Sequence, residues 1–253
     1  GKSYQVWGPG KNPNKKLHWE KGKNWNIGLD WALFNGNLYG SFNYYNRKQQ
    51  DLLGDYTVQV PPYLFTTTFV NVGTMRNYGF EFDITWNAIK TKDFSYTVNV
   101  VGSTMGNKFV SFSNEQYEGR SYEDRVSTQE PYPFHYLQRL EEGKRVGNFY
   151  MWKYAGIDPQ GRWIVYDKDG DKILADNATD EDRQYVGNGL PKFTGSMTHN
   201  FRYKNFDATL FFQTALGFDI FNIHDFYYGI KNFQGNVMDK AYSKNLAVTQ
   251  NPI

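Results

Sequence analysis

The stretch RNYGFEFDITWNAIK, residues 76–90, alternates apolar and polar side chains without a break over ten residues. The apolar set consists of Tyr78, Phe80, Phe82, Ile84 and Trp86, and the polar set of Asn77, Gly79, Glu81, Asp83 and Thr85. Because successive side chains of a β-strand point to opposite faces, the stretch is predicted to be a strand with one apolar and one wet face. That apolar face can lie against a second sheet in a soluble sandwich or against lipid in an outer-membrane barrel.

The same alternation recurs along the chain and predicts an all-β protein built from antiparallel hairpins. Two of the predicted strands flank FNGN at 34–37, which is typical of a hairpin turn, and two others flank the tight KN at 204–205. The predicted strands lie near 24–33, 38–47, 76–87, 94–106, 193–204 and 206–215.

The connections between these strands differ greatly in length. Turns within hairpins take a few residues, whereas 48–75, 107–192 and 216–253 are long. Transmembrane barrels show this asymmetry, with short periplasmic turns and long extracellular loops. We therefore expect the three long segments to be extracellular loops, which favours the barrel over a sandwich with a very long insertion.

Composition excludes several classes of protein. The chain has 253 residues with a net charge of only +2 and no long basic run, so nucleic acid is not expected as a partner. Cysteine is absent, which excludes disulfides and thiolate metal sites. Aromatic residues make up 19% of the chain, yet the mean hydropathy is −0.70 and no apolar run is long enough for a transmembrane helix. A membrane protein of this composition has to cross with strands.

Four stretches resemble the SusC-like branch of TonB-dependent outer-membrane transporters. They are an NP…WE entry to a strand at 12–20, NVGTMRNYGFE at 71–81, GIDP before an Asp-rich turn at 156–159, and a G…PKF strand start at 187–193. The resemblance implies part of a 22-stranded barrel in the outer membrane of a Gram-negative bacterium. It also implies import of glycans, oligosaccharides or peptides, with energy supplied through TonB and a SusD-like lipoprotein as lid. The plug domain, a TonB box and the remaining strands are not found, so we expect a partial barrel.

The barrel interpretation assigns the two faces of the strands. The side chains predicted to face lipid are Phe80, Phe82, Ile84, Val98, Leu210 and Phe212. Those predicted to line the lumen are Glu81, Asp83, Asn99 and Asp207. Polar interior faces are the rule in such barrels. Residues that contact substrate cannot be named from the sequence.

An acidic turn, DKDGDKI at 167–173, is a candidate metal site for Ca²⁺ or Mg²⁺. Asp167, Asp169 and Asp171 have the alternate spacing that lets carboxylates converge on a hard cation, and Ile173 could offer its carbonyl. The resemblance adds Asp182 as a further ligand, because the family has an acidic residue after this turn. The alternative is a solvated acidic turn without an ion.

No pattern predicts an enzyme. The histidines at 18, 135, 199 and 224 are scattered, and neither a zinc-protease nor a serine-hydrolase motif is present. The aromatic cluster FYMWKYAG at 149–156, with Trp163, could stack on sugars or could be the core of a folded loop. A soluble carbohydrate-binding β-sandwich therefore remains the alternative to membrane import.

Overall fold

The computed structural model describes residues 8, 10–113, 120–128, 136–229, 236–239 and 242. His135 and parts of the segments 107–192 and 216–253 lie outside the described residues. The chain divides into two compact units, which we treat separately. Unit 1 comprises Gly1–Ser121, Glu142–Lys144 and Gly195–Thr214, and unit 2 comprises Tyr122–Glu141, Arg145–Thr194 and Ala215–Ile253.

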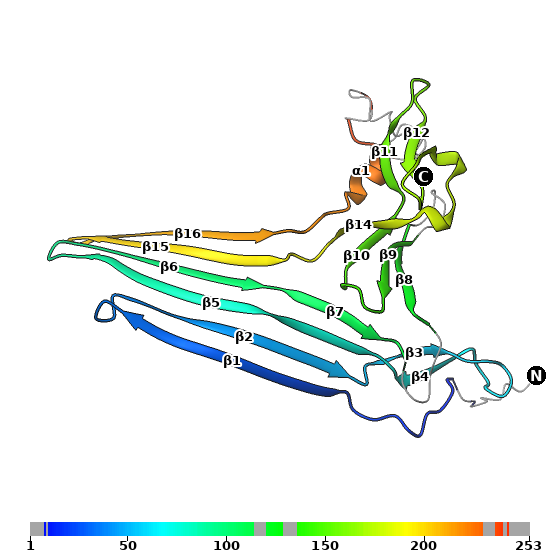
Figure 1. Cartoon of the computed structure of the whole chain (residues 1–253), viewed down its shortest axis with the longest axis horizontal. Helices are drawn as coiled ribbons and strands as arrows, with labels where there is room; N and C mark the ends of the chain where they lie inside the picture. Colours follow the sequence, from blue (N-terminus) through cyan, green and yellow to red (C-terminus); the bar gives the residue numbers. More distant parts are fainter. Residues whose placement is uncertain are drawn as a thin grey trace, which may run out of the picture. The chain divides into compact units, whose positions relative to one another are not determined.

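Unit 1 is built on one antiparallel sheet of long hairpins (Figure 1). Its order is β1–β2–β5–β6–β15–β16, and β7 pairs with β5 beyond the end of β6. The strands are β1 (Lys21–Leu33), β2 (Leu38–Gln50), β5 (Thr74–Lys90), β6 (Phe94–Thr104), β7 (Gly106–Ser111), β15 (Phe193–Tyr203) and β16 (Phe206–Leu216). The six strands predicted from alternation are all present, and they form the all-β hairpin sheet that the sequence predicted.

The FNGN turn closes the first hairpin in register. Leu33 pairs with Leu38, and the chain reverses through Asn35 (φ 55°) and Gly36 (φ 82°). Both residues adopt left-handed backbone, which glycine and asparagine tolerate best. The N–H of Gly36 donates to the carbonyl of Leu33 at 3.1 Å. The turn residues therefore fix which side chains of β1 and β2 lie opposite each other.

The long connections are shorter than predicted. Pairing continues to Gln50 opposite Thr74, so the predicted loop 48–75 is too wide at both ends. Within it, β3 (Leu53–Thr57) and β4 (Thr67–Asn71) form a hairpin of their own. The predicted boundary at 107 is also wrong, because β7 runs to Ser111. Polar residues end the alternation pattern, but backbone hydrogen bonds continue the ladder regardless of side chain.

A small core in unit 1 lies near the β3–β4 hairpin, away from the middle of the long sheet. Its buried apolar side chains are Val70, Val72, Phe109 and Phe112. By contrast, Phe80 and Phe212 on the long strands are 61% and 58% exposed. In the described part of unit 1 no second sheet covers them. The sandwich alternative, which needs these rings sealed between two sheets, is therefore wrong.

The backbone of a neighbouring strand comes very close to Gly79, beside the point where β6 ends and β7 begins. A Cβ atom placed on Gly79 would lie 2.0 Å from the carbonyl oxygen of Thr104 and 2.8 Å from the hydroxyl of Tyr45. The Tyr45 hydroxyl donates to that same carbonyl at 3.2 Å. Only glycine fits at this point, because the neighbours that would have to move include backbone.

Unit 2 consists of short strands in two small sheets. One sheet has the order β14–β10–β9–β8 and the other β11–β12–β13. The elements are β8 (Tyr122–Ser127), β9 (Tyr136–Glu141), β10 (Asn148–Met151), β11 (Lys153–Ile157), β12 (Trp163–Tyr166), β13 (Lys172–Leu174), η1 (Ala175–Asn177), η2 (Asp180–Asp182), β14 (Gln184–Asn188) and α1 (Ile223–Tyr228). Among the residues that the structure describes, no helix is long and apolar enough to span a membrane.

Candidate functional site

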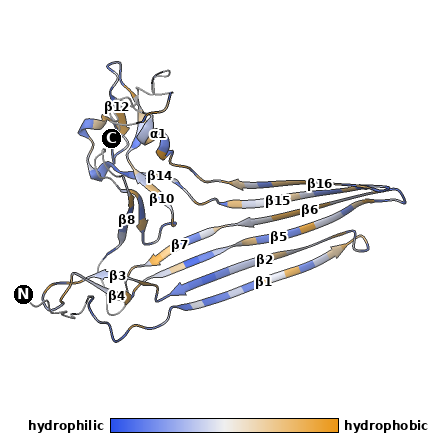
Figure 2. Ribbon diagram, turned by 180° about the vertical axis from the view of Figure 1, so that it is seen from behind, coloured by the Kyte–Doolittle hydropathy of each residue, from blue (hydrophilic) through white to orange (hydrophobic). Residues whose placement is uncertain are grey.

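The apolar face of the unit 1 sheet carries ladders of aromatic side chains. Phe42 lies opposite Phe82, with ring centroids 6.4 Å apart, and stacks on Trp31 at 5.9 Å. In a second ladder, Tyr44 contacts Phe80 at 4.8 Å and Trp25 at 5.3 Å. Apolar and polar residues alternate in colour along β1 and β5 (Figure 2). Such cross-strand pairs stabilise a sheet without a second layer.

The six side chains predicted to face lipid all fall on this apolar face. Phe80, Leu210 and Phe212 are exposed, whereas Phe82, Ile84 and Val98 are half-buried by their neighbours. The pairing Ile84–Val100 and the pairing Trp86–Val98 place β5 and β6 side chains on one face. The sheet therefore presents a continuous apolar surface, as a lipid-facing wall requires.

His199, the one polar residue among the apolar positions of β15, has a specific partner. Its Nδ1 lies 2.8 Å from the hydroxyl of Tyr96, and the two rings are nearly parallel. Phe201 stacks on Tyr96 with centroids 4.7 Å apart. The imidazole thus has a hydrogen-bond partner on another strand. The sequence could not show this pairing, because the two residues are far apart in the chain. This pair lets a polar ring occupy an apolar surface.

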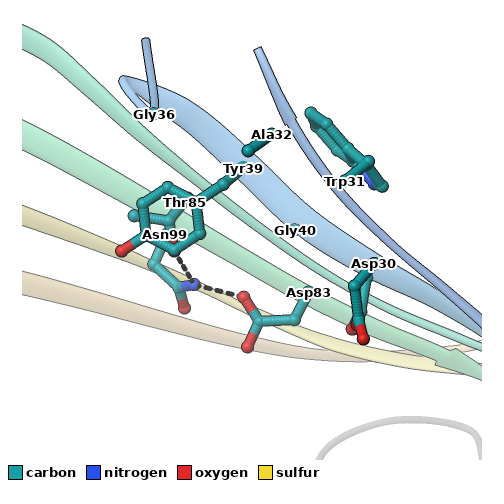
Figure 3. A pocket seen from close by; sticks show the side chains of 10 residues that line it. Asp30, Trp31, Ala32, Gly36, Tyr39, Gly40, Asp83, Thr85 and Asn99 are labelled. Carbon is teal, nitrogen blue, oxygen red and sulfur yellow. Dashed lines mark hydrogen bonds between the residues drawn. The ribbon is translucent and has the colours of Figure 1, made fainter.

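The opposite face of the sheet carries a hydrogen-bonded polar surface. The Asn99 amide donates to the Asp83 carboxylate at 2.7 Å and to the Thr85 hydroxyl at 2.9 Å. Asp30 and Asp83 point to one side of the strands and Trp31 to the other (Figure 3). These groups line a shallow depression of ≈ 740 Å³. Carboxylates, amides and hydroxyls suit a water-filled surface more than a packed interface.

The other predicted lumen residues also lie on this polar face. Glu81 and Asp207 are exposed, and the neighbouring Thr209 donates from its hydroxyl to Asn200 at 2.9 Å. Apolar side chains interrupt the face, among them Val101 and Phe211, which are 38% and 60% exposed. The structure thus separates the two predicted sets onto opposite faces. Which face meets lipid and which meets the lumen stays a prediction.

The acidic turn in unit 2 does not bring its predicted metal ligands together. One oxygen of Asp167 accepts the backbone N–H groups of Asp169 (2.9 Å) and Asp171 (2.8 Å). Ile173 pairs with Val165 in the β12–β13 ladder. The described part of the chain holds no group of three or more His, Asp or Glu side chains arranged for a metal ion. The cation site therefore stays a prediction without support from the geometry.

Asp182, the fifth proposed ligand, instead caps the short helix η2. Its carboxylate accepts the backbone N–H of Thr179 at 2.8 Å, the Thr179 hydroxyl at 2.9 Å and the backbone N–H of Lys168 at 3.1 Å. These hydrogen bonds, led by the Thr179 N–H, lower the pKa of the Asp182 carboxyl below its usual range. These hydrogen bonds join the acidic turn to η2.

A polar cluster that the sequence did not reveal ties β8, β9 and β10 together. The Arg139 guanidinium makes a two-pronged contact with Asp124 at 2.7 and 2.8 Å and lies between the rings of Tyr122 and Tyr150. The bond to Asp124 raises the pKa of Arg139. Next to it, burial and a hydrogen bond to Glu141 raise the pKa of the Tyr185 hydroxyl.

The aromatic cluster at 149–156 is divided between these elements. Tyr150 belongs to the Arg139 cluster, and the Trp152 indole donates to the carbonyl of Thr179 at 2.7 Å. Tyr154 is 54% exposed and meets Trp163 edge-on at 5.4 Å. Most of the cluster is therefore packed within unit 2, and Tyr154 is the ring left most open to solvent.

Comparison with known proteins identifies this arrangement. Residues 3–232 match the family described as TonB dependent receptor-like, beta-barrel. The chain belongs to this family. TonB-dependent receptor P3 of Formosa agariphila is 33% identical over 226 residues, which is 83% of this chain and 22% of that protein. TonB-dependent receptor SusC of Bacteroides thetaiotaomicron is 26% identical over 254 residues, or 98% of this chain and 24% of that protein.

A solved structure shows the same fold. The RagAB peptide transporter superposes with a TM-score of 0.71 at 24% identity, covering 90% of this chain and 24% of that one. The chain thus spans between a fifth and a quarter of the length of the relatives it matches. As a segment of a TonB-dependent receptor-like β-barrel, it is located in the outer membrane of a Gram-negative bacterium.

Proposed function

We propose that this chain forms part of the wall of an outer-membrane transporter that imports glycans, oligosaccharides or peptides. Energy would come through TonB, and a SusD-like lipoprotein would cover the extracellular side. The observation that carries the proposal is the single sheet with one exposed aromatic face and one hydrogen-bonded polar face. Family membership and the SusC relative support the energy source and the lid. The proposal gives the chain a role in transport and no catalytic step.

The polar face is proposed to line the solute path, with the Asp83–Asn99 network as part of the lumen wall. Hydrated, already paired polar groups allow a solute to pass without a strong binding site. The apolar face with Phe80 and Phe212 is proposed to meet lipid, because outward-facing apolar bands are the rule in these barrels. The long connections are proposed to lie on the extracellular side, because transmembrane barrels have short periplasmic turns and long extracellular loops.

Cysteine labelling of the intact protein tests this orientation directly. The chain itself has no cysteine, so Phe80→Cys and Glu81→Cys each introduce a single new thiol in it. In an embedded barrel we expect a water-soluble maleimide to modify the thiol at position 81 and to leave that at position 80 unmodified. A lipid-dissolved quencher should act on a label at position 80 only. Equal labelling of both positions by the water-soluble reagent would contradict the assignment.

Uptake measurements test the transport step. Cells that carry the intact protein should accumulate labelled oligosaccharides or peptides, and accumulation should stop when TonB is deleted or the proton gradient is collapsed. Competition between the two solute classes then identifies the substrate class. Accumulation that persists at the same rate without TonB would overturn the proposal of active import.

A further inference from the structure

Four cations from four strands lie side by side on the apolar face of the unit 1 sheet. In the register of the sheet, Lys23 is opposite Lys48, Lys48 is opposite Arg76, and Arg76 is opposite Lys108. We call these four residues the basic row. Directly opposite residues share a face, with strands ~4.8 Å apart, so the row spans ~14 Å. Lys23, Arg76 and Lys108 are exposed, and Lys48 is half-buried.

No carboxylate among the described residues neutralises the basic row. None of the four forms an ion pair with a described residue. The nearby Asp51 is already engaged, at 3.0 Å by Lys21 and at 3.3 Å by His18. Like charges directly opposite each other destabilise a sheet. Without an ion pair to a described residue, the four cations repel one another, and an anionic ligand would remove this repulsion.

Two neighbouring side chains contact the Arg76 guanidinium and fix its position. Its Nε donates to the buried Asn46 side chain at 3.0 Å, and its guanidinium lies 5.3 Å from the centroid of the Tyr78 ring. The Asn46 bond occupies Nε only, so the terminal nitrogens of the guanidinium are available to an external acceptor. Arginine held in this way is suited to two-pronged contact with phosphate.

The position of the basic row matches a membrane interface. The next positions on the same face, toward the middle of the strands, are Trp25, Asn46, Tyr78 and Gly106, and two of these four are aromatic. From Lys23 to Leu33 the strand rises ~33 Å, which becomes ~25 Å when tilted by about 40°. That is the height of the apolar band in outer-membrane barrels. The basic row thus lies at the upper edge of the band, at the level of lipid headgroups.

We propose that the basic row binds the phosphate groups of an anionic glycolipid in the leaflet at the long-connection end of the barrel. The proposal rests on the lipid-facing orientation proposed above. The row lies on the face opposite the Asp83–Asn99 surface, so its ligand approaches from the membrane and not from the solute path. Its four cations match the paired phosphates of a lipid such as lipid A better than the single charge of an ordinary phospholipid.

Lipid binding to the intact, detergent-purified barrel tests the proposal. The probe is lipid A titrated in its phosphorylated form, with dephosphorylated lipid A and inorganic phosphate as the two comparison ligands. Native mass spectrometry counts the bound lipid. The test variant carries Lys23→Gln, Lys48→Gln, Arg76→Gln and Lys108→Gln. A matched control carries Lys90→Gln, Lys92→Gln and Lys204→Gln at the short-turn end, and a conservative variant carries Lys23→Arg, Lys48→Arg and Lys108→Arg.

We expect the test variant to lose about tenfold or more in affinity for phosphorylated lipid A, since each cation near an anionic lipid contributes several-fold. The control and the conservative variant should bind like wild type. Dephosphorylated lipid A should bind wild type about tenfold more weakly, and millimolar inorganic phosphate should not displace the lipid, because the acyl chains also contribute. Equal affinity of wild type and test variant would overturn the proposal, as would full displacement by inorganic phosphate.

The labelling and lipid-binding experiments distinguish an error in the proposed lipid-facing orientation from an error in the proposed lipid site. If the thiol at position 80 is open to water, the sheet does not face lipid and both proposals fall. If position 80 lies in lipid and the test variant still binds lipid A like wild type, only the lipid site is wrong. Heat-modifiable migration on gels confirms that each variant is a folded barrel.

Discussion

The two units of this chain use aromatic and charged side chains in opposite ways. In the long sheet of unit 1, rings such as Phe80 are exposed and the polar network of Asp83 lies on the other face. In unit 2, the buried residues include Val165 and Leu137, and the Arg139–Asp124 pair is largely enclosed by tyrosine rings. In the proposed orientation lipid covers the apolar face of unit 1, whereas unit 2 makes its own core.

This contrast shows how composition alone can mislead. Both units contain many aromatic residues, yet in unit 1 they form an outer surface and in unit 2 they pack around charges. The arginine in unit 2 replaces part of an apolar core, because its flat guanidinium stacks on rings while its N–H groups bind a carboxylate. Four changes probe the contrast, beginning with the one expected to cost most.

Phe82→Arg should destabilise the inserted intact barrel by about 2 to 4 kcal/mol, because a charge near the middle of the lipid-facing band is desolvated. Glu81→Arg, one residue earlier on the polar face, should cost much less because that side chain meets water. Equilibrium unfolding in urea from lipid vesicles measures both. Equal costs at the two positions would remove the distinction between the faces, and a larger cost at position 81 would reverse it.

Arg139→Gln should destabilise unit 2 by about 2 kcal/mol. The change leaves Asp124 without its main partner in a site where both side chains are only about 15% exposed, so the cost lies between those of surface and fully buried pairs. Arg125→Gln is the matched control: its contact with Glu123 is on the surface, with the arginine 56% exposed, and should be worth under about 1 kcal/mol.

Hydrogen exchange of the β8 and β9 amides in the intact protein compares these two arginine variants. Faster exchange in Arg139→Gln alone is expected. Similar protection in both variants would mean that the stacked pair is no more important than an exposed one.

The sequence predicted unit 1 far better than unit 2, for a physical reason. Alternation over ten residues in 76–90 identifies a strand and both of its faces, and FNGN fixes the register of its hairpin. The strands of unit 2, such as β13 (Lys172–Leu174), are too short to show a period. Asp167 matched a metal pattern, and the family resemblance added Asp182, because acidic residues that bind ions and those that accept backbone N–H groups look alike in sequence.

The sequence also did not show which residues the register places side by side across several strands. Lys23, Lys48, Arg76 and Lys108 are each ordinary in their own strands, and only the pairing brings them into one row. The Tyr96–His199 pair is similar, since its members are 103 positions apart. Long-range pairing is decided by the whole sheet, so such sites could not be found strand by strand.

Acidification should destabilise the region around η2, and we expect this effect to be smaller than that of Arg139→Gln. The pKa of Asp182 is lowered by folding, so its carboxylate contributes stability that is present above the unfolded-state pKa of about 4 and is lost as pH falls through the lower folded-state value. The indole N–H signal of Trp152, which donates to Thr179, should report this change. Asp182→Asn should remove the pH dependence; a pH response identical to wild type would assign it to another group.

Chelation should have the smallest effect. Asp167 already accepts two backbone N–H groups and Asp182 accepts three donors, so the geometry predicts that EDTA leaves amide exchange across residues 167–182 unchanged. Asp169→Asn is the control, because its charge is not used in these bonds. Faster exchange with EDTA, reversed by Ca²⁺ and absent in Asp169→Asn, would restore the metal site that the spacing predicted.

The close approach at Gly79 restricts how this wall can change during evolution. Any side chain there would meet the Thr104 carbonyl and the Tyr45 hydroxyl, so a mutation at this position cannot be accepted unless β6 and β7 shift together. Gly54 in β3, with no atom within 4 Å of where its Cβ would lie, is under no such restriction. Among descendants of a common ancestor, position 54 should drift freely while position 79 stays glycine, even as the solute carried by the barrel changes.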